Sequence, residues 1–111
     1  MNLSRKTCVP CREGAPKLEG LLLASYIRAV NPAWQLFDGS TKLKRVFVFE
    51  DFRQAVDFTN RVADIAEQEG HHPNMYIYAY NKVRIELWTH KIGGLHENDF
   101  ILAAKIDALK P

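Results

Sequence analysis

The sequence predicts an α+β fold with the element order α-β-β-α-β-β-α, in which helices pack on one face of a four-stranded antiparallel sheet. Three observations lead to this prediction: two pairs of β-rich segments joined by short turns, a helix-spaced apolar stripe between the pairs, and helical patterns at both ends. Short turns join antiparallel neighbours, and the apolar face of a sheet needs helices to cover it. A length of 111 residues fits one domain, so we expect a single domain over residues 1–111 with an irregular leader at 1–15.

The first half of the chain contains a helix and a hairpin. Apolar residues at three- and four-residue steps predict a helix over residues 17–30. Residues 33–37 and 42–49 are β-rich and flank the pair Asp38-Gly39. Asp-Gly is a strong turn signal because glycine accepts a positive φ without strain. The two segments are therefore predicted to be the first two strands.

The second half repeats this order with a longer helix. A helical apolar stripe covers residues 52–69, with Asp51 as a plausible N-cap and Gly70 where a helix-ending glycine would stand. Residues 74–80 and 83–89 follow as β-rich segments with a short turn between them. We expect them to form the third and fourth strands, the fourth half-buried because its apolar and polar residues alternate.

A last helix is predicted over residues 98–109. Its apolar residues lie on more than one side of the helix: Phe100, Ile101, Leu102, Ala103, Ala104, Ile106 and Leu109. One sheet cannot cover all of these sides, so we expect a subunit interface and a homodimer or homotetramer.

Charge and hydropathy limit the expected partners. The net charge of +2 is too small to indicate a nucleic-acid or membrane partner. The basic run 42–45 alternates with an apolar residue, which favours a solvated strand face, with a groove for anions as the alternative. No apolar stretch is long enough to span a bilayer, and the N-terminal residues lack the apolar segment of a signal peptide. We expect a soluble, cytoplasmic protein.

The leader contains a lone Cys-x-x-Cys pair, Cys8 and Cys11. A zinc ribbon needs a second pair of ligands, and the sequence has no other cysteine. A thioredoxin-like site would follow a strand, and only a short polar segment precedes Cys8. Free thiols or a local structural element are the favoured interpretation, with metal binding and redox chemistry as alternatives.

Three of the four histidines converge in the predicted fold. His71 and His72 lead into the third strand and His90 ends the fourth. In a hairpin, the start of one strand lies beside the end of the next. The helix over 52–69 brings Glu67 one turn before His71, and the last helix can bring Asp99 to the same end. We therefore expect three imidazoles and two carboxylates at one edge of the sheet.

Several chemistries suit such a cluster. Adjacent histidines on extended backbone point to opposite sides, which disfavours a shared zinc ion, although a metal-dependent hydrolase stays an alternative. No Gly-x-Ser-x-Gly elbow supports nucleophilic catalysis, and no glycine-rich motif indicates a nucleotide cofactor. Ordinary polar residues at helix and strand ends are a further alternative. Imidazole exchanges protons near neutrality, so the cluster favours acid–base catalysis by a cofactor-free isomerase, hydratase or dehydratase.

The segments that carry these residues resemble the pterin-4a-carbinolamine dehydratase family. They read EQEGHHP, YNKV, LWTH and GGLHENDFILAAKID. The family pattern is an acidic residue, a His-His-Pro, an aromatic residue, a histidine and an aspartate, matched here by Glu67, His71, His72, Pro73, Tyr80, His90 and Asp99. The resemblance extends to Trp34, Phe49 and the segment DFRQAVDF, and the leader CVPCREGAPKL is similar to that of the microbial and plant branch.

The resemblance implies a specific reaction and site. The reaction would be dehydration of 4a-hydroxytetrahydrobiopterin to quinonoid dihydropterin, which recycles tetrahydrobiopterin without a metal or organic cofactor. His71, His72 and His90 would be the catalytic residues, of which His71 and His90 move protons and His72 contacts the pterin. Glu67 and Asp99 would support them. The residues implied to contact the substrate are Gly70, His71, His72, Pro73, Trp88, Thr89, His90 and Lys91.

The resemblance also implies partners and a second candidate function. Members of the family assemble as dimers and tetramers and serve aromatic amino acid hydroxylases. Some act as dimerisation cofactors of a transcription factor, hepatocyte nuclear factor. A non-catalytic dimerisation, coactivator or scaffold protein on the same fold is therefore the alternative.

Three departures from the family pattern add expectations. One extra residue between Pro73 and Tyr80, relative to the animal branch, predicts a β-bulge. Gly70 replaces an acidic residue of that branch. His96 stands where Ser or Thr usually caps the last helix, so we expect this helix start to fray, or His96 to lie near the pocket.

Overall fold

The computed structural model describes residues 2–10 and 14–109, so Cys11 and part of the leader lie outside the described residues. The predicted α+β class and element order are confirmed, with two short 3₁₀ helices in addition. The elements are η1 (Leu3–Arg5), α1 (Gly20–Ala29), β1 (Gln35–Phe37), β2 (Lys42–Val48), α2 (Phe52–Glu69), β3 (Asn74–Tyr78), β4 (Lys82–Leu87), η2 (His90–Ile92) and α3 (Glu97–Asp107).

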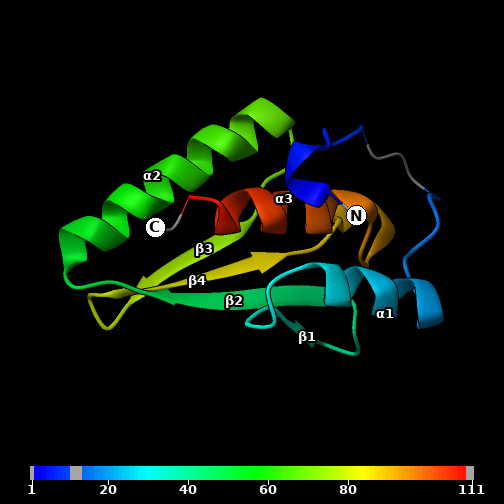
Figure 1. Ribbon diagram of the computed structural model, residues 1–111, viewed down its shortest axis with the longest axis horizontal. Coiled ribbons are helices and arrows are strands. Elements are labelled where there is room, and N and C mark those ends of the chain that lie inside the picture. The colour runs from blue at the N-terminus through cyan, green and yellow to red at the C-terminus, as the bar shows by residue number, and fades with distance from the viewer. Residues whose placement is uncertain (1, 11–13, 110–111) are drawn as a thin grey trace.

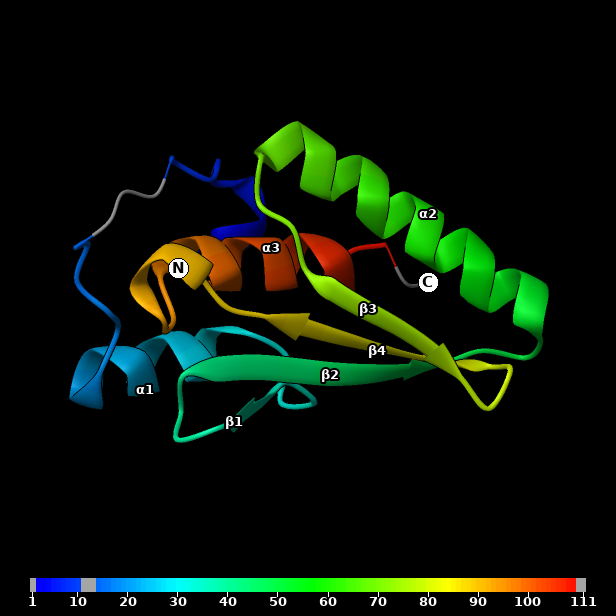
Figure 2. The same cartoon turned by 180° about the vertical axis from the view of Figure 1, so that it is seen from behind.

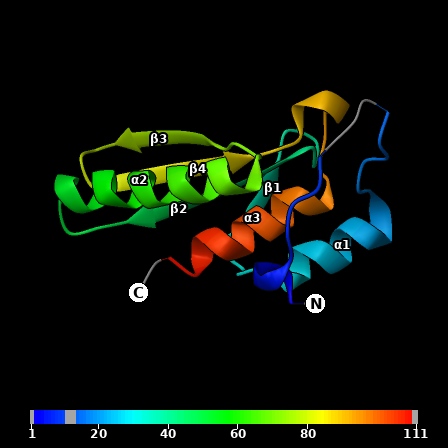
Figure 3. The same ribbon diagram turned by 90° about the horizontal axis from the view of Figure 1, so that it is seen from above.

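The strands form one antiparallel sheet in the order β1-β2-β4-β3, with α2 and α3 over one face (Figure 1). Seen from above, α1 runs beside α3 rather than over the long strands (Figure 3). The second strand of each hairpin lies at the centre of the sheet, and the register pairs Leu43 with Leu87 and Phe47 with Val83. These four side chains are at most 1% exposed. The alternation in the sequence therefore identified the covered face of both central strands.

The three basic side chains of the run 42–45 in β2 each contact an acidic or aromatic side chain. Arg45 lies on the covered face and forms a 2.7 Å ion pair with Asp107 of α3. On the other face, the Nζ atom of Lys42 lies 4.3 Å from the centre of the Trp88 ring, and that of Lys44 lies 4.9 Å from the Phe37 ring. Cations over aromatic rings gain electrostatic attraction while staying hydrated. The arrangement favours the solvated strand face over an anion groove.

Helix α2 has the bounds that the sequence predicts because both of its ends carry local signals. The Asp51 carboxylate accepts a 2.8 Å hydrogen bond from the backbone N–H of Gln54. Gly70 ends the helix in the left-handed region, at φ 66° and ψ 27°. The N–H groups of Gly70 and His71 both donate to the carbonyl of Ala66. The chain therefore leaves α2 in a fixed direction, and that direction places His71.

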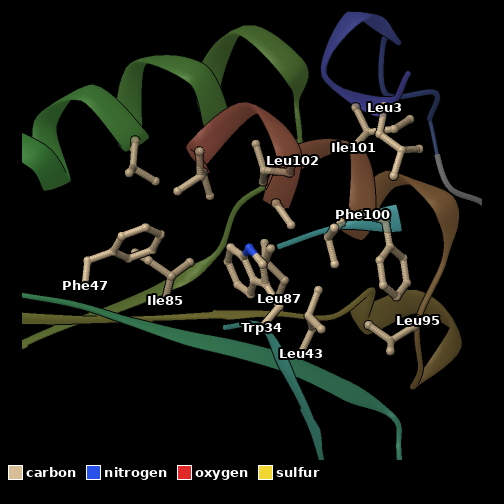
Figure 4. Close-up of a cluster of buried hydrophobic side chains, with 14 of the residues drawn as sticks. Leu3, Trp34, Leu43, Phe47, Ile85, Leu87, Leu95, Phe100, Ile101 and Leu102 are labelled. Atoms are coloured by element: carbon tan, nitrogen blue, oxygen red, sulfur yellow. The ribbon is translucent and has the colours of Figure 1, made fainter. Parts of the chain in front are cut away.

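The expected subunit contact of the last helix rested on an incorrect argument. The apolar side chains of α3 are covered within the chain: Phe100, Ile101, Leu102, Ala103 and Ile106 are at most 1% exposed. The sheet covers one side, α1 and α2 flank the helix, and η1 of the leader supplies Leu3 near Ile101 (Figure 4). The sequence argument missed η1, because a three-residue 3₁₀ helix has no periodic pattern. Oligomeric state stays a prediction without this support.

Two other expectations are wrong. The extra residue before Tyr80 does not form a β-bulge, because β3 and β4 pair without interruption from Asn74–Glu86 to Tyr78–Lys82. The turn takes up the extra residue, with Ala79 and Tyr80 both at positive φ. Several element ends also differ by one to three residues, because terminal residues without a cap signal carry little information.

His96 does not leave the last helix frayed. It is the N-cap of α3, and its Nδ1 atom accepts a 3.1 Å hydrogen bond from the backbone N–H of Asn98. The Asp99 carboxylate in turn accepts from the backbone N–H of His96 at 3.0 Å, which completes a capping box. The helix that carries Asp99 therefore begins at a fixed point. Within the described part of the chain, none of the helices is both long enough and apolar enough to cross a membrane.

Candidate active site

A cavity of about 450 Å³ lies where the chain leaves α2, where β4 ends and where α3 begins. Figure 2 shows these three places at one end of the molecule, with the α2–β3 connection passing close to the start of α3. The residues that line the cavity are Val9, Pro10, Gly70, His71, His72, Pro73, Asn74, Trp88, Thr89, His90, Lys91 and Asn98. All eight residues expected to contact substrate are among them.

His71 is held by a buried carboxylate. Its Nε2 atom lies 2.6 Å from Oδ1 of Asp99, which is fully buried. The other oxygen, Oδ2, accepts hydrogen bonds from the Thr89 hydroxyl at 2.9 Å and from the backbone N–H of His96 at 3.0 Å. A carboxylate that accepts these bonds places a proton on Nε2 of His71 and fixes its ring. Nδ1 is then the ring nitrogen available for proton transfer.

His72 has a different and more open setting. Its Nε2 atom lies 2.7 Å from Oε2 of Glu67, and the two side chains are 62% and 78% exposed. Since this pair is solvated, it holds the ring less firmly than Asp99 holds His71. The two adjacent histidines therefore have different partners, as extended backbone requires.

His90 stands at the other side of the cavity and begins η2. Its ring stacks on the Trp88 ring with centres 4.5 Å apart and planes at 38°. Two backbone hydrogen bonds between Thr89 and Gly94, and the left-handed Gly93, turn the chain sharply after β4. That turn directs His90 away from the strand and to the cavity. The structure thus brings all three predicted histidines to one cavity, with Asp99 behind His71 and Glu67 beside His72.

Cys8 is a poor candidate for chemistry. Its thiol is a free, buried group whose pKa is raised to about 12 by burial and by the nearby negative charge of Glu69. The thiolate is the form that attacks substrates and binds metals, so a thiol that stays protonated favours the structural interpretation. Over residues 2–10 and 14–109, no three His, Cys, Asp or Glu side chains are grouped so that they could hold a metal ion.

A second cavity is larger but lacks the chemistry of the first. It has a volume of about 550 Å³ and lies between α1 and the loop after β1. Apolar side chains supply much of its lining, and its titratable residues are Lys17 and Glu19. Proton transfer near neutrality needs groups such as imidazole. The histidine cavity is therefore the candidate active site despite its smaller volume.

Sequence reasoning missed four lining residues: Val9, Pro10, Asn74 and Asn98. Asn74 directly follows the His-His-Pro segment and could have been included by adjacency. Val9 and Pro10 lie in the leader, and the likeness of CVPC to other leaders was the one signal available. Asn98 carried no signal, because its role depends on contacts with residues about 90 positions away.

Comparison with known proteins places the chain among enzymes of one class. The family model for pterin 4 alpha carbinolamine dehydratase matches residues 16–109. A protein of Methylococcus capsulatus, provisionally named a pterin-4-alpha-carbinolamine dehydratase, is 48% identical over 108 residues, covering 97% of this chain and 93% of the relative. One of Marinobacter nauticus, with the same provisional name, is 47% identical and covers 97% of each chain.

A solved structure agrees with these sequence matches. The crystal structure of a transcriptional coactivator/pterin dehydratase from Brucella melitensis has a TM-score of 0.79 and 34% identity, covering 86% of this chain and all of that one. The fold is thus that of a hydro-lyase family. The chain belongs to the pterin 4 alpha carbinolamine dehydratase family.

Proposed function

We propose that the protein dehydrates 4a-hydroxytetrahydrobiopterin to quinonoid dihydropterin and so recycles tetrahydrobiopterin. The observation that carries this proposal is one cavity lined by His71, His72 and His90, with Asp99 bonded to His71, in a chain of this family. The reaction removes one water molecule and changes no oxidation state. Proton donors and acceptors are therefore the groups that it needs, and no metal or organic cofactor is required.

The bond changes define two tasks for the protein. The C4a–O bond breaks, and its electron pair leaves with the oxygen, which needs a proton to depart as water. The N5 lone pair forms the C4a=N5 double bond, and the N5 proton is then lost to a base. Hydroxide is a poor leaving group, so a general acid at the oxygen lowers the barrier most, and a general base at N5 completes the step.

His71 is suited to the base at N5. With Nε2–H donated to Asp99, its Nδ1 presents a lone pair, and the carboxylate stabilises the imidazolium that forms when the ring accepts a proton. His90 is then the acid at the leaving hydroxyl. Its ring stands against the Trp88 ring, with the two ring centres 4.5 Å apart, at the side of the cavity across from His71. The two histidines would exchange these protonation states with water after each turnover.

The rest of the cavity would bind the pterin. His72 and Lys91 offer polar groups, Trp88 offers a flat apolar face, and Pro73 and Gly70 shape the backbone between the histidines. A pterin is a flat, polar bicycle, and an aromatic face with polar groups around it suits such a ligand. Thr89 is 3% exposed and donates to Asp99, so it would act through that residue.

Assembly into a homodimer or homotetramer is part of the proposal. The strand β3 forms an outer edge of the sheet, and four of its side chains, Met75, Tyr76, Ile77 and Tyr78, are 37–41% exposed. An open edge with exposed apolar side chains is usually covered in a stable protein. A second copy of the chain would cover this edge, and light scattering coupled to size exclusion would report the mass.

A coactivator or scaffold role is the second candidate. Its support comes from the names of two relatives: the Brucella protein is a transcriptional coactivator/pterin dehydratase, and a pterin dehydratase-like protein of the alpha-carboxysome is a RuBisCO assembly factor. The second structure has a TM-score of 0.60 and 28% identity, covering 69% of this chain and 88% of that one. A transcription factor or an aromatic amino acid hydroxylase is the kind of partner that this role, or the recycling role, would require.

One assay separates the two candidates. Chemically generated 4a-carbinolamine loses water slowly by itself, and the absorbance of quinonoid dihydropterin follows that loss. We expect the protein to accelerate it, and we expect the same acceleration from Glu19→Gln, which alters the other cavity. A rate equal to the spontaneous one would reject the dehydratase and leave the scaffold role.

A further inference from the structure

The leader forms part of the wall of the candidate active site. Val9 and Pro10 line the same cavity as His71, His72 and His90, although about 60 to 80 residues of sequence separate the two groups. Val9 is 57% exposed and is one of the residues that line this cavity. An apolar side chain held open at the mouth of a polar cavity is in position to contact a flat ligand.

Asn98 fixes the position of Val9. The backbone N–H of Val9 donates to Oδ1 of Asn98 at 3.0 Å, and Nδ2 of Asn98 donates back to the Val9 carbonyl at 2.6 Å. An amide that pairs with both backbone groups of one residue sets its orientation as well as its distance, much as a strand neighbour would. Asn98 is 2% exposed, and both bonds are partly buried.

A second pair of contacts anchors the residue before Val9. The backbone N–H of Cys8 donates to Oε1 of Glu69 at 2.8 Å, and its thiol lies 3.6 Å from the Asn98 carbonyl. Glu69 is the last residue of α2, two before His71, and Asn98 directly precedes Asp99. The leader is therefore tied to the same two helix ends that hold His71 and its carboxylate.

We propose that residues 8–10 are a substrate-binding wall of the pterin site and that Asn98 is the residue that positions this wall. The proposal rests on the proposed function, because the ligand is the pterin of that reaction. Without the Asn98 amide, Val9 would lose both backbone partners and the wall would move from the cavity. His71, Asp99 and His90 would keep their contacts, so binding should weaken while proton transfer continues.

Three variants test this through the split between KM and kcat. Asn98→Ala removes both bonds to Val9, and Val9→Gly removes the wall side chain but leaves Asn98 in place. Each is expected to raise KM by roughly 10-fold, the scale of about one net hydrogen bond or one small apolar contact, with kcat changed less than about 3-fold. Lys6→Ala is the matched control, because it removes an exposed ion pair between the leader and Glu97 away from the cavity.

The KM results decide the proposal even if one variant is unstable. Val9 is exposed, so Val9→Gly should fold normally if Asn98→Ala does not. An unchanged KM in Val9→Gly would overturn the proposal that residues 8–10 contact the substrate. A loss of kcat at unchanged KM in Asn98→Ala would overturn the proposal that Asn98 positions these residues. An equal rise of KM in Lys6→Ala would also overturn it, because the effect would then belong to any loosening of the leader.

A binding measurement keeps this test separate from the activity. Hydrogen exchange of the Cys8 and Val9 amides in the wild-type protein, with and without oxidised biopterin, reports the wall directly. We expect added protection with the pterin, and weaker biopterin binding by calorimetry in Asn98→Ala. Added protection without any dehydratase turnover would reject the proposed reaction but support the wall. Turnover without added protection would reject the wall and leave the reaction intact.

Discussion

The Nε2 atom of His71 lies 2.6 Å from Oδ1 of Asp99, across 28 residues of sequence. Three local features of the structure create this contact. Gly70 turns the chain out of α2, the capping box of His96 fixes the start of α3, and the Thr89 hydroxyl holds the second carboxylate oxygen. These contacts fix the direction of the buried Asp99 side chain, and a carboxylate at this place favours the His71 tautomer with its proton on Nε2 and one orientation of the ring.

The first prediction concerns this carboxylate. Asp99→Asn keeps the size of the side chain, but its amide can donate to His71 and so move the ring proton to Nδ1. That tautomer has no lone pair facing the cavity, and we expect turnover to fall by roughly 10²-fold or more with little change in KM. Steady-state kinetics would measure the change. A rise in KM alone, with kcat unchanged, would contradict the assigned role.

The second prediction distinguishes His72 from its neighbour. Its ring is 62% exposed and bonded to an exposed Glu67, so we propose that it contacts substrate without moving protons. His72→Ala is expected to raise KM by roughly 10-fold and to leave most of kcat, because one contact is lost. Glu67→Gln should have a smaller effect, since exposed pairs contribute little. Loss of kcat in His72→Ala as large as in a His71 variant would reverse this assignment.

The third prediction is a pH dependence of stability at the start of α3. Glu97 accepts hydrogen bonds from Lys6 and Tyr26, and these two donors lower its pKa below the usual 4.5. The folded protein therefore binds this proton less tightly than the unfolded chain does. The resulting stabilisation of the folded protein is complete above pH 4.5. It is lost as the pH falls through the pKa that Glu97 has in the folded protein, which is lower than 4.5.

Comparison with Glu97→Gln isolates this contribution. At pH 7 we expect the wild type to unfold at a temperature roughly a few degrees above the variant. The difference should shrink as the pH falls below 4.5, because the wild-type carboxyl then also becomes neutral. Thermal unfolding followed by circular dichroism measures both proteins. A difference that is constant or larger at acid pH would contradict the lowered pKa.

The fourth prediction concerns the Cys8 thiol. Burial raises its pKa to about 12, so the thiolate is scarce at neutral pH. In Cys11→Ser, alkylation of Cys8 by iodoacetamide should be at least about 10²-fold slower in the folded protein than in urea. Mass spectrometry of timed samples gives both rates. Equal rates would show that the thiol is open to the solvent, which the docked leader does not allow.

Local signals explain how much of the fold the sequence could predict. Helix α2 was located at both ends because Asp51 and Gly70 lie next to the positions where they act. The convergence of His71 and His90 followed from hairpin geometry alone. What was missed depends on contacts between distant segments: the docking of η1 on α3, and the pairing of Asn98 with Val9.

In the candidate site, too, some features could be predicted from local signals and others depend on contacts between distant segments. Residue types and strand ends sufficed to predict which imidazoles meet, and the cavity contains all of them. Which carboxylate bonds to which histidine could not be predicted, because it depends on where the side chains of Glu67 in α2 and Asp99 in α3 point. His96 is a clear example: its ring acts as a cap through Nδ1, whereas its low cap propensity predicted fraying.

The central claim is that His71 and His90 move the two protons of a dehydration. The most direct measurement is the rate at which 4a-carbinolamine is converted to quinonoid dihydropterin by the wild type, His71→Ala, His90→Ala and the double variant. We predict that each single substitution lowers turnover by roughly 10²-fold or more and that the double variant approaches the spontaneous rate, with all four proteins folded. Turnover near the wild-type level in either single variant would contradict the account.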